Sequence, residues 1–244
     1  MDGSVVSFYV GSHDPSAVLI IDPSLTFSTF TGSVVDNWGF TAAPDPNGNL
    51  YAGGIVFGAG YPLTTGAYDV SFNGGTGGFP IDVGITKFNA AGNALIYSTY
   101  LGGSGNETPN SIIGAPNGDL FIYGVTSSVN FPMAGTPYDP TFNGGPSVTE
   151  NSLNFNGADI FIARLNPTGT GLLASTFVGG NGTDGLNIEN LQYNYGDQFR
   201  GEIVLDENMN VYVASTTYSA NFPVVGGMQG GISGIQDAVA FRMP

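Results

Sequence analysis

The chain contains no cysteine and one histidine, and only four of its 244 residues are basic. Without cysteine there is no disulfide framework, no thiol nucleophile and no cysteine-ligated zinc. The basic residues, Lys87, Arg164, Arg200 and Arg242, stand singly against 19 acidic residues, and the formal net charge is −15. Nucleic-acid binding depends on clustered Lys and Arg that displace counterions from phosphates. The charge balance therefore argues against nucleic acid as a partner.

Long hydrophobic runs are also absent. The longest wholly aliphatic stretch, Ala17–Ile21, is far shorter than the roughly 20 residues of a membrane-spanning helix. The first residues, Met1–Val6, lack the basic and apolar regions of an export signal. Hydrophobic residues nevertheless make up 41% of the chain and aromatic residues 12%. Because this apolar content can build a core, we expect a folded protein without a membrane span.

The sequence is rich in internal repeats, and a fixed repeat order decides the architecture. One set of segments shares a Leu-x-x-Ser-Thr-aromatic-x-Gly pattern: Leu25–Gly32, Leu95–Gly102 and Leu172–Gly179. A second set begins with a turn-forming asparagine: Asn47–Gly54, Asn117–Gly124 and Asn208–Ser215. A third set begins with aspartate: Asp82–Phe88, Asp159–Leu165 and Asp237–Met243. The three sets recur in one order, which indicates three repeated units.

Each unit is predicted to contain four short strands. Residues 83–88 and 94–101 are rich in β-branched and aromatic residues and flank a Gly-containing loop. Strands are also expected at 5–10 and 18–21, before the first unit. Helical periodicity is nearly absent, and only 186–195 could hold a helical turn. The predicted fold class is all-β.

The second hairpin of each unit is identified by its turn residues. Asn47-Gly48 and Asn117-Gly118 predict type I′ turns, which need positive φ at both central positions. Met209 replaces the glycine in the third unit. Because side chains are disfavoured at positive φ, we expect a different or longer turn there.

Tandem units of four antiparallel strands are typical of β-propeller blades, whereas parallel solenoid coils have shorter periods of about 20 residues. We assign residues 1–244 to one β-propeller segment, with units at about 16–81, 82–158 and 159–236 and a further unit opening at 237–244. Three units and one strand cannot close a ring of 4 to 8 blades. We therefore expect the remaining blades of a parent chain, or a partner chain, to complete the sheet.

The second unit carries an ordered series of motifs: Lys87-Phe88-Asn89, Leu95–Gly103, Asn117-Gly-Asp119, Asn130-Phe-Pro132 and Phe142–Gly145. This series resembles the bacterial SBBP-type β-propeller repeat family, and variants of it cover nearly the whole chain. The resemblance implies a module of a large secreted or surface-anchored protein, frequently cargo of the type 9 secretion system and in some cases linked to adhesion and gliding motility. It implies location and architecture, not a reaction. The chain departs from the pattern at Met209, in the insert 180–202 and in the linker 224–236.

No catalytic constellation is evident. His13 lies in a turn-like stretch, and a single histidine offers neither a multi-His metal site nor an obvious Ser-His system. Two facing carboxylates would suffice for a glycosidase, but the glutamates fall in no shared motif: Glu107, Glu150, Glu189, Glu202 and Glu207. We therefore predict that the chain is not an enzyme, and we assign no catalytic, cofactor-binding or metal-binding residue.

Calcium is the one ion for which the loops offer an argument. Oxygen ligands on Gly-rich loops suit Ca²⁺, and such residues recur at Asp36-Asn37, Asn106-Glu107 and Thr183-Asp184. Each of these loops has only one carboxylate. The turns at 45–49 and 206–210 lack the spacing and the bidentate glutamate of an EF-hand. Local turn hydrogen bonds explain the same residues, so calcium ligation and turn formation both stay open.

Two further sets of residues recur or stand out. Asp82, Asp159 and Asp237 either cap turns by accepting backbone N–H bonds or line a central channel. Trp38 is expected in a loop, where its ring could stack on a sugar. Aromatic residues at repeated strand positions are expected in the core: Tyr51, Tyr97, Tyr100, Phe121, Phe177 and Tyr212.

These observations suggest a non-catalytic, extracellular adhesive or scaffold module of a bacterial surface or secreted protein, acting through protein–protein interaction or a surface glycan. The alternative is a carbohydrate-binding module or the accessory domain of a carbohydrate-active enzyme. A third interpretation is a spacer that carries a distant functional domain.

Overall fold

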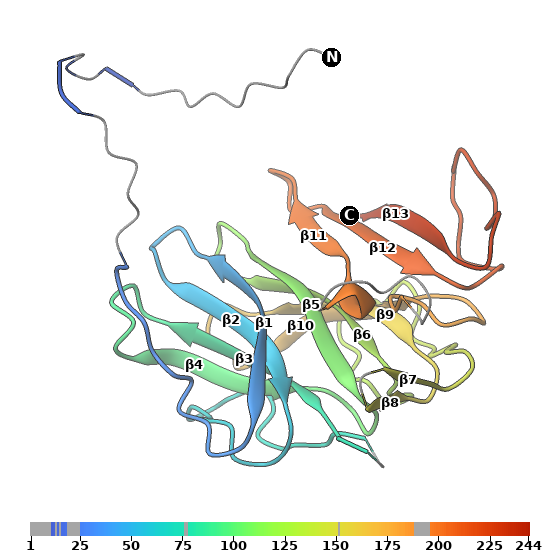
Figure 1. Ribbon diagram of the computed structural model, residues 1–244, viewed down its shortest axis with the longest axis horizontal. Coiled ribbons are helices and arrows are strands. Elements are labelled where there is room, and N and C mark those ends of the chain that lie inside the picture. Colours follow the sequence, from blue (N-terminus) through green and yellow to red (C-terminus); the bar gives the residue numbers. More distant parts are fainter. Residues whose placement is uncertain are drawn as a thin grey trace.

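The computed structural model describes residues 11–12, 14, 16–18, 25–75, 78–150, 152–187 and 196–244. In this part of the chain three antiparallel sheets follow one another, accompanied by one short hairpin and one 3₁₀ turn (Figure 1). The all-β prediction is confirmed. No helix among the described residues has the length and apolar character to cross a membrane.

The first two sheets have four strands each and the same topology. The first has the order β1-β2-β3-β4, formed by Asn37–Pro44, Leu50–Val56, Asp82–Phe88 and Leu95–Leu101. The second has the order β5-β6-β9-β10, formed by Glu107–Gly114, Leu120–Thr126, Asp159–Leu165 and Leu172–Val178. In both, β-branched and aromatic residues fill the strands and glycines occupy the turns, which is why short strands form where the sequence predicts them.

The third sheet contains three strands in the order β11-β12-β13, formed by Glu202–Leu205, Val211–Thr217 and Asp237–Met243. The short hairpin β7-β8, Val148–Glu150 and Leu153–Phe155, lies in the connection between β6 and β9. The 3₁₀ turn η2, Asp197–Phe199, precedes β11. The expected helical turn at 186–195 falls largely on residues outside the described part of the chain, as do His13, the strand expected at 5–10 and most of that expected at 18–21.

The sheets are out of phase with the sequence units. The strand that opens the second unit, β3, pairs along its whole length with β2 of the preceding unit, from Val56↔Asp82 to Leu50↔Phe88. The strand β9 pairs with β6 in the same way, and β13 with β12. Each four-stranded sheet therefore joins the second hairpin of one unit to the first hairpin of the next.

Successive sheets pack face to face through their first strands. The strand β5 contacts β1 and β2 on one side and β11 on the other. One buried cluster, which includes Tyr51, Ile85 and Phe161, fills the space between the first two sheets. A second cluster, which includes Tyr123 and Val213, lies between the second sheet and the third. All residues of β6 are buried, whereas β13 alternates between partly buried and exposed residues. The described residues do not close a ring.

The hairpins at Asn47-Gly48 and Asn117-Gly118 form, but their turn type differs from the prediction. Gly48 N–H donates to Asp45 O at 3.0 Å, and Asp45 N–H donates to Asn49 O at 2.9 Å. Positive φ is confined to the glycines of these turns, 79° at Gly48 and 89° at Gly118. This is a three-residue loop with glycine in the left-handed position, a connection that needs only one residue of positive φ.

The prediction of a different turn at Met209 is wrong. Met209 has φ 62° and occupies the position of Gly48 and Gly118. Met209 N–H donates to Asp206 O at 3.0 Å, and Asp206 N–H donates to Asn210 O at 3.2 Å, as in the other two turns. The Asp206 carboxylate also accepts the N–H groups of Asn208 and Asn210, both at 2.9 Å. These bonds and the packing of Met209 against the second core cluster offset the strain of a side chain at positive φ.

Candidate functional site

Asp82 is the first residue of β3. Its side chain is completely buried where the first sheet meets the second. Its Oδ2 accepts the backbone N–H of Asn73 at 2.5 Å. Its Oδ1 has no hydrogen-bond partner among the described residues. A β-carbon on Gly102 would lie 2.4 Å from Asp82 Oδ1 and 2.8 Å from Oε2 of Glu107, the first residue of β5. The two carboxyl groups therefore meet over a glycine that has no room for a side chain.

Glu107 is equally buried and is surrounded by donors. Its Oε1 accepts the Thr126 hydroxyl at 2.6 Å and also the Ser128 hydroxyl. Burial raises the pKa of Asp82 to about 8, and the neighbouring Glu107 charge acts in the same direction. Burial also raises the pKa of Glu107, against the effect of the two hydroxyls. Both shifts favour a protonated carboxyl group in the pair near neutral pH, because two buried carboxylates side by side repel each other.

The same arrangement recurs where the second sheet meets the third. A β-carbon on Gly179 would lie 2.5 Å from Asp159 Oδ1 and 2.8 Å from Asp184 Oδ2. Asp184 accepts the Ser219 hydroxyl at 2.8 Å and also the Thr217 hydroxyl. Asp159 accepts two backbone N–H groups, at 2.7 and 3.1 Å. Burial raises the pKa of Asp159 to about 7. We call each pair, with its glycine and two hydroxyls, a carboxyl junction.

The turn-capping interpretation of the recurring aspartates is confirmed at Asp82 and Asp159, which accept backbone N–H bonds from the preceding loops. Asp237 differs from both. It is only partly buried, and its carboxylate accepts the N–H of Ala238 at 3.0 Å and the Nε2 of Gln229 at 3.1 Å. Sequence reasoning does not predict the meeting of Asp82 with Glu107. The sequence pattern singles out both segments, but for separate roles.

Two of the three loops considered for calcium direct their carboxylates inward, at Glu107 and Asp184, whereas Asp36 is exposed. Glu107 and Asp184 accept hydrogen bonds from hydroxyl and N–H donors. Asp45 and Asp206 accept N–H groups of their own turns, as local turn formation predicts. In the described ranges, no three His, Cys, Asp or Glu side chains are grouped so that they could hold a metal ion.

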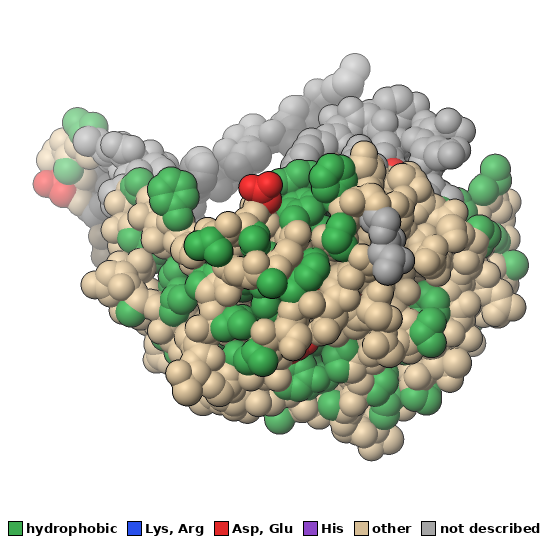
Figure 2. Space-filling model, turned by 90° about the horizontal axis from the view of Figure 1, so that it is seen from below, with side chains coloured by type: hydrophobic (Ala, Val, Ile, Leu, Met, Phe, Trp, Pro, Cys, Tyr) green, Lys and Arg blue, Asp and Glu red, His purple; other side chains and the backbone are tan. Residues whose placement is uncertain are grey.

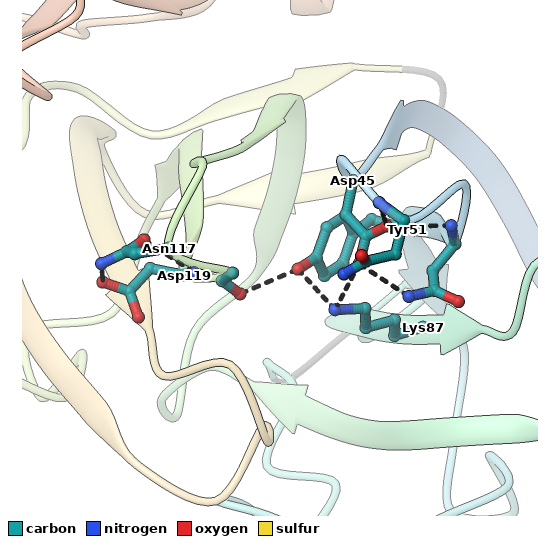
Figure 3. Close-up of polar contacts among 8 residues, drawn as sticks. Asp45, Tyr51, Lys87, Asn117 and Asp119 are labelled. Carbon is teal, nitrogen blue, oxygen red and sulfur yellow. Dashed lines mark hydrogen bonds and ion pairs between the residues drawn. The ribbon is translucent and has the colours of Figure 1, made fainter.

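A second polar network joins the first two sheets at the end of β3 that lies away from Asp82 (Figure 3). Lys87 Nζ donates to Tyr51 OH at 2.8 Å and forms an ion pair with Asp45 at 2.9 Å. Tyr51 OH in turn donates to the backbone oxygen of Gly118 at 2.8 Å, across to the second sheet. Burial acts to raise the pKa of Asp45, but hydrogen bonds from Asn49 and Lys87 outweigh it and lower this pKa to about 2.

Three of the four basic residues occupy one repeated position. Each cation lies over an aromatic ring on the adjacent strand: Lys87 over Tyr51 at 4.5 Å, Arg164 over Phe121 at 5.1 Å and Arg242 over Tyr212 at 5.7 Å. Arg164 also pairs with Asp119 at 2.5 Å. Sequence reasoning describes these cations as isolated. All three cations stand at the same position of the segments that begin with aspartate. Because side chains directly opposite each other on adjacent strands are in contact, this shared position could have predicted the cation–aromatic pairs.

The aromatic positions are mostly as predicted. Five of the six expected core residues are buried: Tyr51, Tyr97, Tyr100, Phe121 and Phe177. Tyr212 is 38% exposed, because the third sheet has no described sheet packed on its other face. The expectation of a loop at Trp38 is wrong, since Trp38 lies in β1.

Trp38 belongs to an exposed aromatic cluster. Its ring contacts Phe57 edge-on, with centroids 5.0 Å apart, and Phe57 contacts Phe79 at 6.2 Å. Trp38 is 44% exposed and Phe79 is 55% exposed. We call Trp38, Phe57 and Phe79 the aromatic patch. Rings held in this way at a surface can stack on a flat apolar ligand face.

One polar cavity adjoins the first carboxyl junction. It has a volume of about 340 Å³, and its lining includes Asp69, Asn73, Gly102, Gly103 and Asn130. Asn130 Oδ1 accepts the N–H of Ser104 at 2.9 Å, so part of the rim is already engaged in structure.

No protein-family model matches the chain, and no curated protein is similar to it in sequence.

Proposed function

We propose that this chain is a non-catalytic, extracellular adhesive or scaffold module built from β-propeller blades, belonging to a large bacterial surface or secreted protein. The carboxyl junction carries the proposal, because the same constellation occurs twice at successive sheet contacts. A catalytic constellation is normally unique in its fold, whereas repeated architecture reuses one contact at every step. Asp82 and Asp159, whose pKa values burial raises to about 8 and about 7, therefore lie at contacts between sheets.

The packing of the sheets supports the blade interpretation. The first strand of the second sheet, β5, contacts β1 and β11, the first strands of the sheets before and after it. Contacts between the first strands of successive sheets are expected for consecutive propeller blades, and they support this interpretation. The SBBP-type resemblance supports an extracellular location, export by the type 9 secretion system and a role in adhesion or gliding motility.

The surface is suited to contact with other molecules. Figure 2 shows one face of the molecule with many hydrophobic side chains and few acidic ones. A chain with a net charge of −15 that leaves such a face nearly uncharged can approach another surface there without strong repulsion.

Adhesion can be tested with the full chain coupled to beads in a flow cell. We expect coated beads to resist detachment from surfaces coated with mucin glycoprotein or bacterial exopolysaccharide, in comparison with albumin-coated beads. Equal detachment of the two bead types from both surfaces, or hydrolysis of a polysaccharide by the purified chain, would contradict the proposal.

A carbohydrate-binding module is the second candidate, and the aromatic patch favours it. Binding to a glycan array that disappears in Trp38→Ala would support this candidate. The matched control is Tyr138→Ala, which removes another exposed ring, 56% exposed, outside the patch.

A further inference from the structure

The polar cavity beside the first carboxyl junction is enclosed by three loops. Residues 68–73 come from the connection between β2 and β3, residues 102–104 from the connection between β4 and β5, and residues 130–132 from the loop after β6. Its volume of about 340 Å³ lies within the range of small-ligand pockets, roughly 300 to 1,000 Å³. The cavity is therefore large enough for one small ring.

One wall of the cavity is bare backbone that the fold holds in place. Three successive N–H groups, at residues 104–106, donate to side chains of residues 127–130 at 2.6 to 2.9 Å. A β-carbon on Gly103 would lie 2.6 Å from the β-carbon of Ser128, so this wall has no room for a side chain there. Glycine lets a ligand approach the backbone closely, and a wall that is already fixed lowers the entropy cost of binding.

Asn130 presents hydrogen-bond donors at the cavity. Its Oδ1 accepts the N–H of Ser104 at 2.9 Å and the hydroxyl of Ser104 at 2.8 Å, which fixes the orientation of the amide. Asn221 Oδ1 accepts the N–H of Asn181 at 2.8 Å in the same way, so the oxygen serves the fold at both junctions. The Nδ2 of Asn130 has two N–H donors, and no described residue accepts a hydrogen bond from them.

Asp69 and Asn73 present acceptors at the same cavity. Asp69 Oδ1 accepts the N–H of Ser71 at 2.8 Å, and its Oδ2 accepts Asn73 Nδ2 at 3.3 Å. Because each carboxylate oxygen has two acceptor positions, each keeps one for a ligand. The Nδ2 of Asn73 is bound in this way, whereas no described residue donates to its Oδ1. The cavity thus offers donors on one loop and acceptors on another.

The chemistry of the lining selects among ligand classes. Among the described residues that line the cavity there is no Lys or Arg, and the charge of Asp69 repels anions. No cluster of three His, Cys, Asp or Glu is found in the described ranges, which argues against a cation. A hydroxyl both donates and accepts, so a neutral ring with adjacent hydroxyls matches these groups. Tyr68 and Pro132 supply apolar surface for the C–H face of such a ring.

We propose that this cavity binds one neutral pyranose unit of a glycan, with Asn130 Nδ2 donating to a ring hydroxyl and Asp69 accepting from ring hydroxyls. The sugar site is distinct from the aromatic patch, because none of Trp38, Phe57 and Phe79 lines the cavity. The inference supplies a ligand class for the adhesive module and rests on that proposed function for its role at a surface.

The substitution Asn130→Asp separates the ligand contact from the fold. Aspartate keeps an oxygen for the Ser104 N–H but has no N–H donors. The matched control is Asn93→Asp, which makes the same change at an exposed turn amide whose Oδ1 accepts Asn89 Nδ2 at 2.8 Å. Saturation-transfer NMR with the full chain measures binding of the methyl glycosides of glucose, galactose, mannose, N-acetylglucosamine and fucose.

We expect at least one of these glycosides to bind, and the side-chain amide signal of Asn130 to shift as that glycoside is added. Asn130→Asp should weaken binding about tenfold or more, whereas Asn93→Asp and Trp38→Ala should bind as the unmodified chain does. Binding of none of the five glycosides would overturn the proposal. So would an unchanged affinity in Asn130→Asp, or stronger saturation transfer to triglycine than to any glycoside.

The flow-cell assay keeps this inference separate from the adhesive function. Beads that hold to mucin or exopolysaccharide equally well with the unmodified chain and with Asn130→Asp, while no glycoside binds, would overturn the sugar site and leave adhesion in place. Glycoside binding that Asn130→Asp weakens, without any bead adhesion, would support the sugar site and contradict the adhesive function.

Discussion

The carboxyl groups of Asp82 and Glu107 meet across Gly102, in a space where a single β-carbon would approach both oxygens closely, at 2.4 and 2.8 Å. Both side chains are completely buried. The contact joins the third strand of one sheet to the first strand of the next. Asp159 and Asp184 form a similar pair over Gly179, with Asp159 at the start of β9 and Asp184 bridged to Thr217 of β12. We therefore expect the stability of both sheet contacts to depend on protonation.

Stability is expected to fall as pH rises from about 5 to about 8.5. Burial raises the folded-state pKa of Asp82 to about 8 and that of Asp159 to about 7, from a usual value of 3.8. A carboxyl whose pKa is raised by folding contributes stability that is complete below its unfolded-state pKa and is lost as pH rises through the folded pKa. A tenfold difference in proton affinity between the folded and unfolded chain corresponds to about 1.4 kcal/mol, so we expect a loss of about 1 to 3 kcal/mol. Urea denaturation across this range measures it.

The variant Asp82→Asn separates the junction from other titrating groups. Its side chain keeps an acceptor for Asn73 N–H and gains a donor for Glu107. We expect the variant to lose less stability than the unmodified chain over the same pH range. An unchanged pH slope in Asp82→Asn/Asp159→Asn would show that the junctions do not hold the protons.

Gly102→Ala is expected to destabilise the fold by about 1 to 3 kcal/mol, because the new methyl group overlaps two buried oxygens. Gly39→Ala is the matched control. Gly39 lies in β1 of the same sheet that Gly102 directly follows, and a β-carbon at Gly39 meets nothing within 4 Å. Thermal unfolding of both variants measures the difference, and equal midpoints would refute the close approach at Gly102.

Met209 allows the turn geometry to be tested. In a strand interior alanine is favoured over glycine, but at φ 62° the order should reverse. We therefore expect Met209→Gly to be more stable than Met209→Ala by about 1 kcal/mol. Both variants lose the same packing of the methionine side chain, so the comparison isolates the backbone. Greater stability of the alanine variant in urea would mean that the turn differs in solution.

Lys87→Met is expected to cost about 3 kcal/mol, because it leaves the Asp45 carboxylate without its buried cation. Arg242→Met, at the equivalent position of the third sheet, removes only an exposed contact with Tyr212. We expect it to cost about 1 kcal/mol or less. Similar losses for the two variants in denaturant titrations would contradict a special role for the Lys87 network.

Local sequence features predict the strands well. The repeated segments mark most of the strands, and the glycines mark the hairpins, because both depend on neighbouring residues. The segment Leu25–Gly32 is the exception, since it forms no strand. Met209 shows the limit of this reasoning. Its φ is imposed by the flanking hairpin and by the Asp206 side chain, and tertiary contacts here override residue preference.

The candidate site is less predictable, since it depends on contacts between sheets. Asp82 aligns with Asp159 in the repeat and not with Glu107, so alignment of units conceals which residues meet. The grouping into units also hides the true sheets, because β2 and β3 belong to different units yet pair along their full length. Local sequence predicts a loop at Trp38, but pairing with Ile55 places this residue in β1.

Carbon-13 NMR of the side-chain carboxyl groups measures directly whether protonated carboxyl pairs join successive sheets. We predict that the unmodified chain shows carboxyl resonances that titrate near pH 8 and near pH 7, for Asp82 and Asp159. Both titrations should be missing in Asp82→Asn/Asp159→Asn. Titration of every carboxyl group below about pH 5 in the unmodified chain would contradict the junctions.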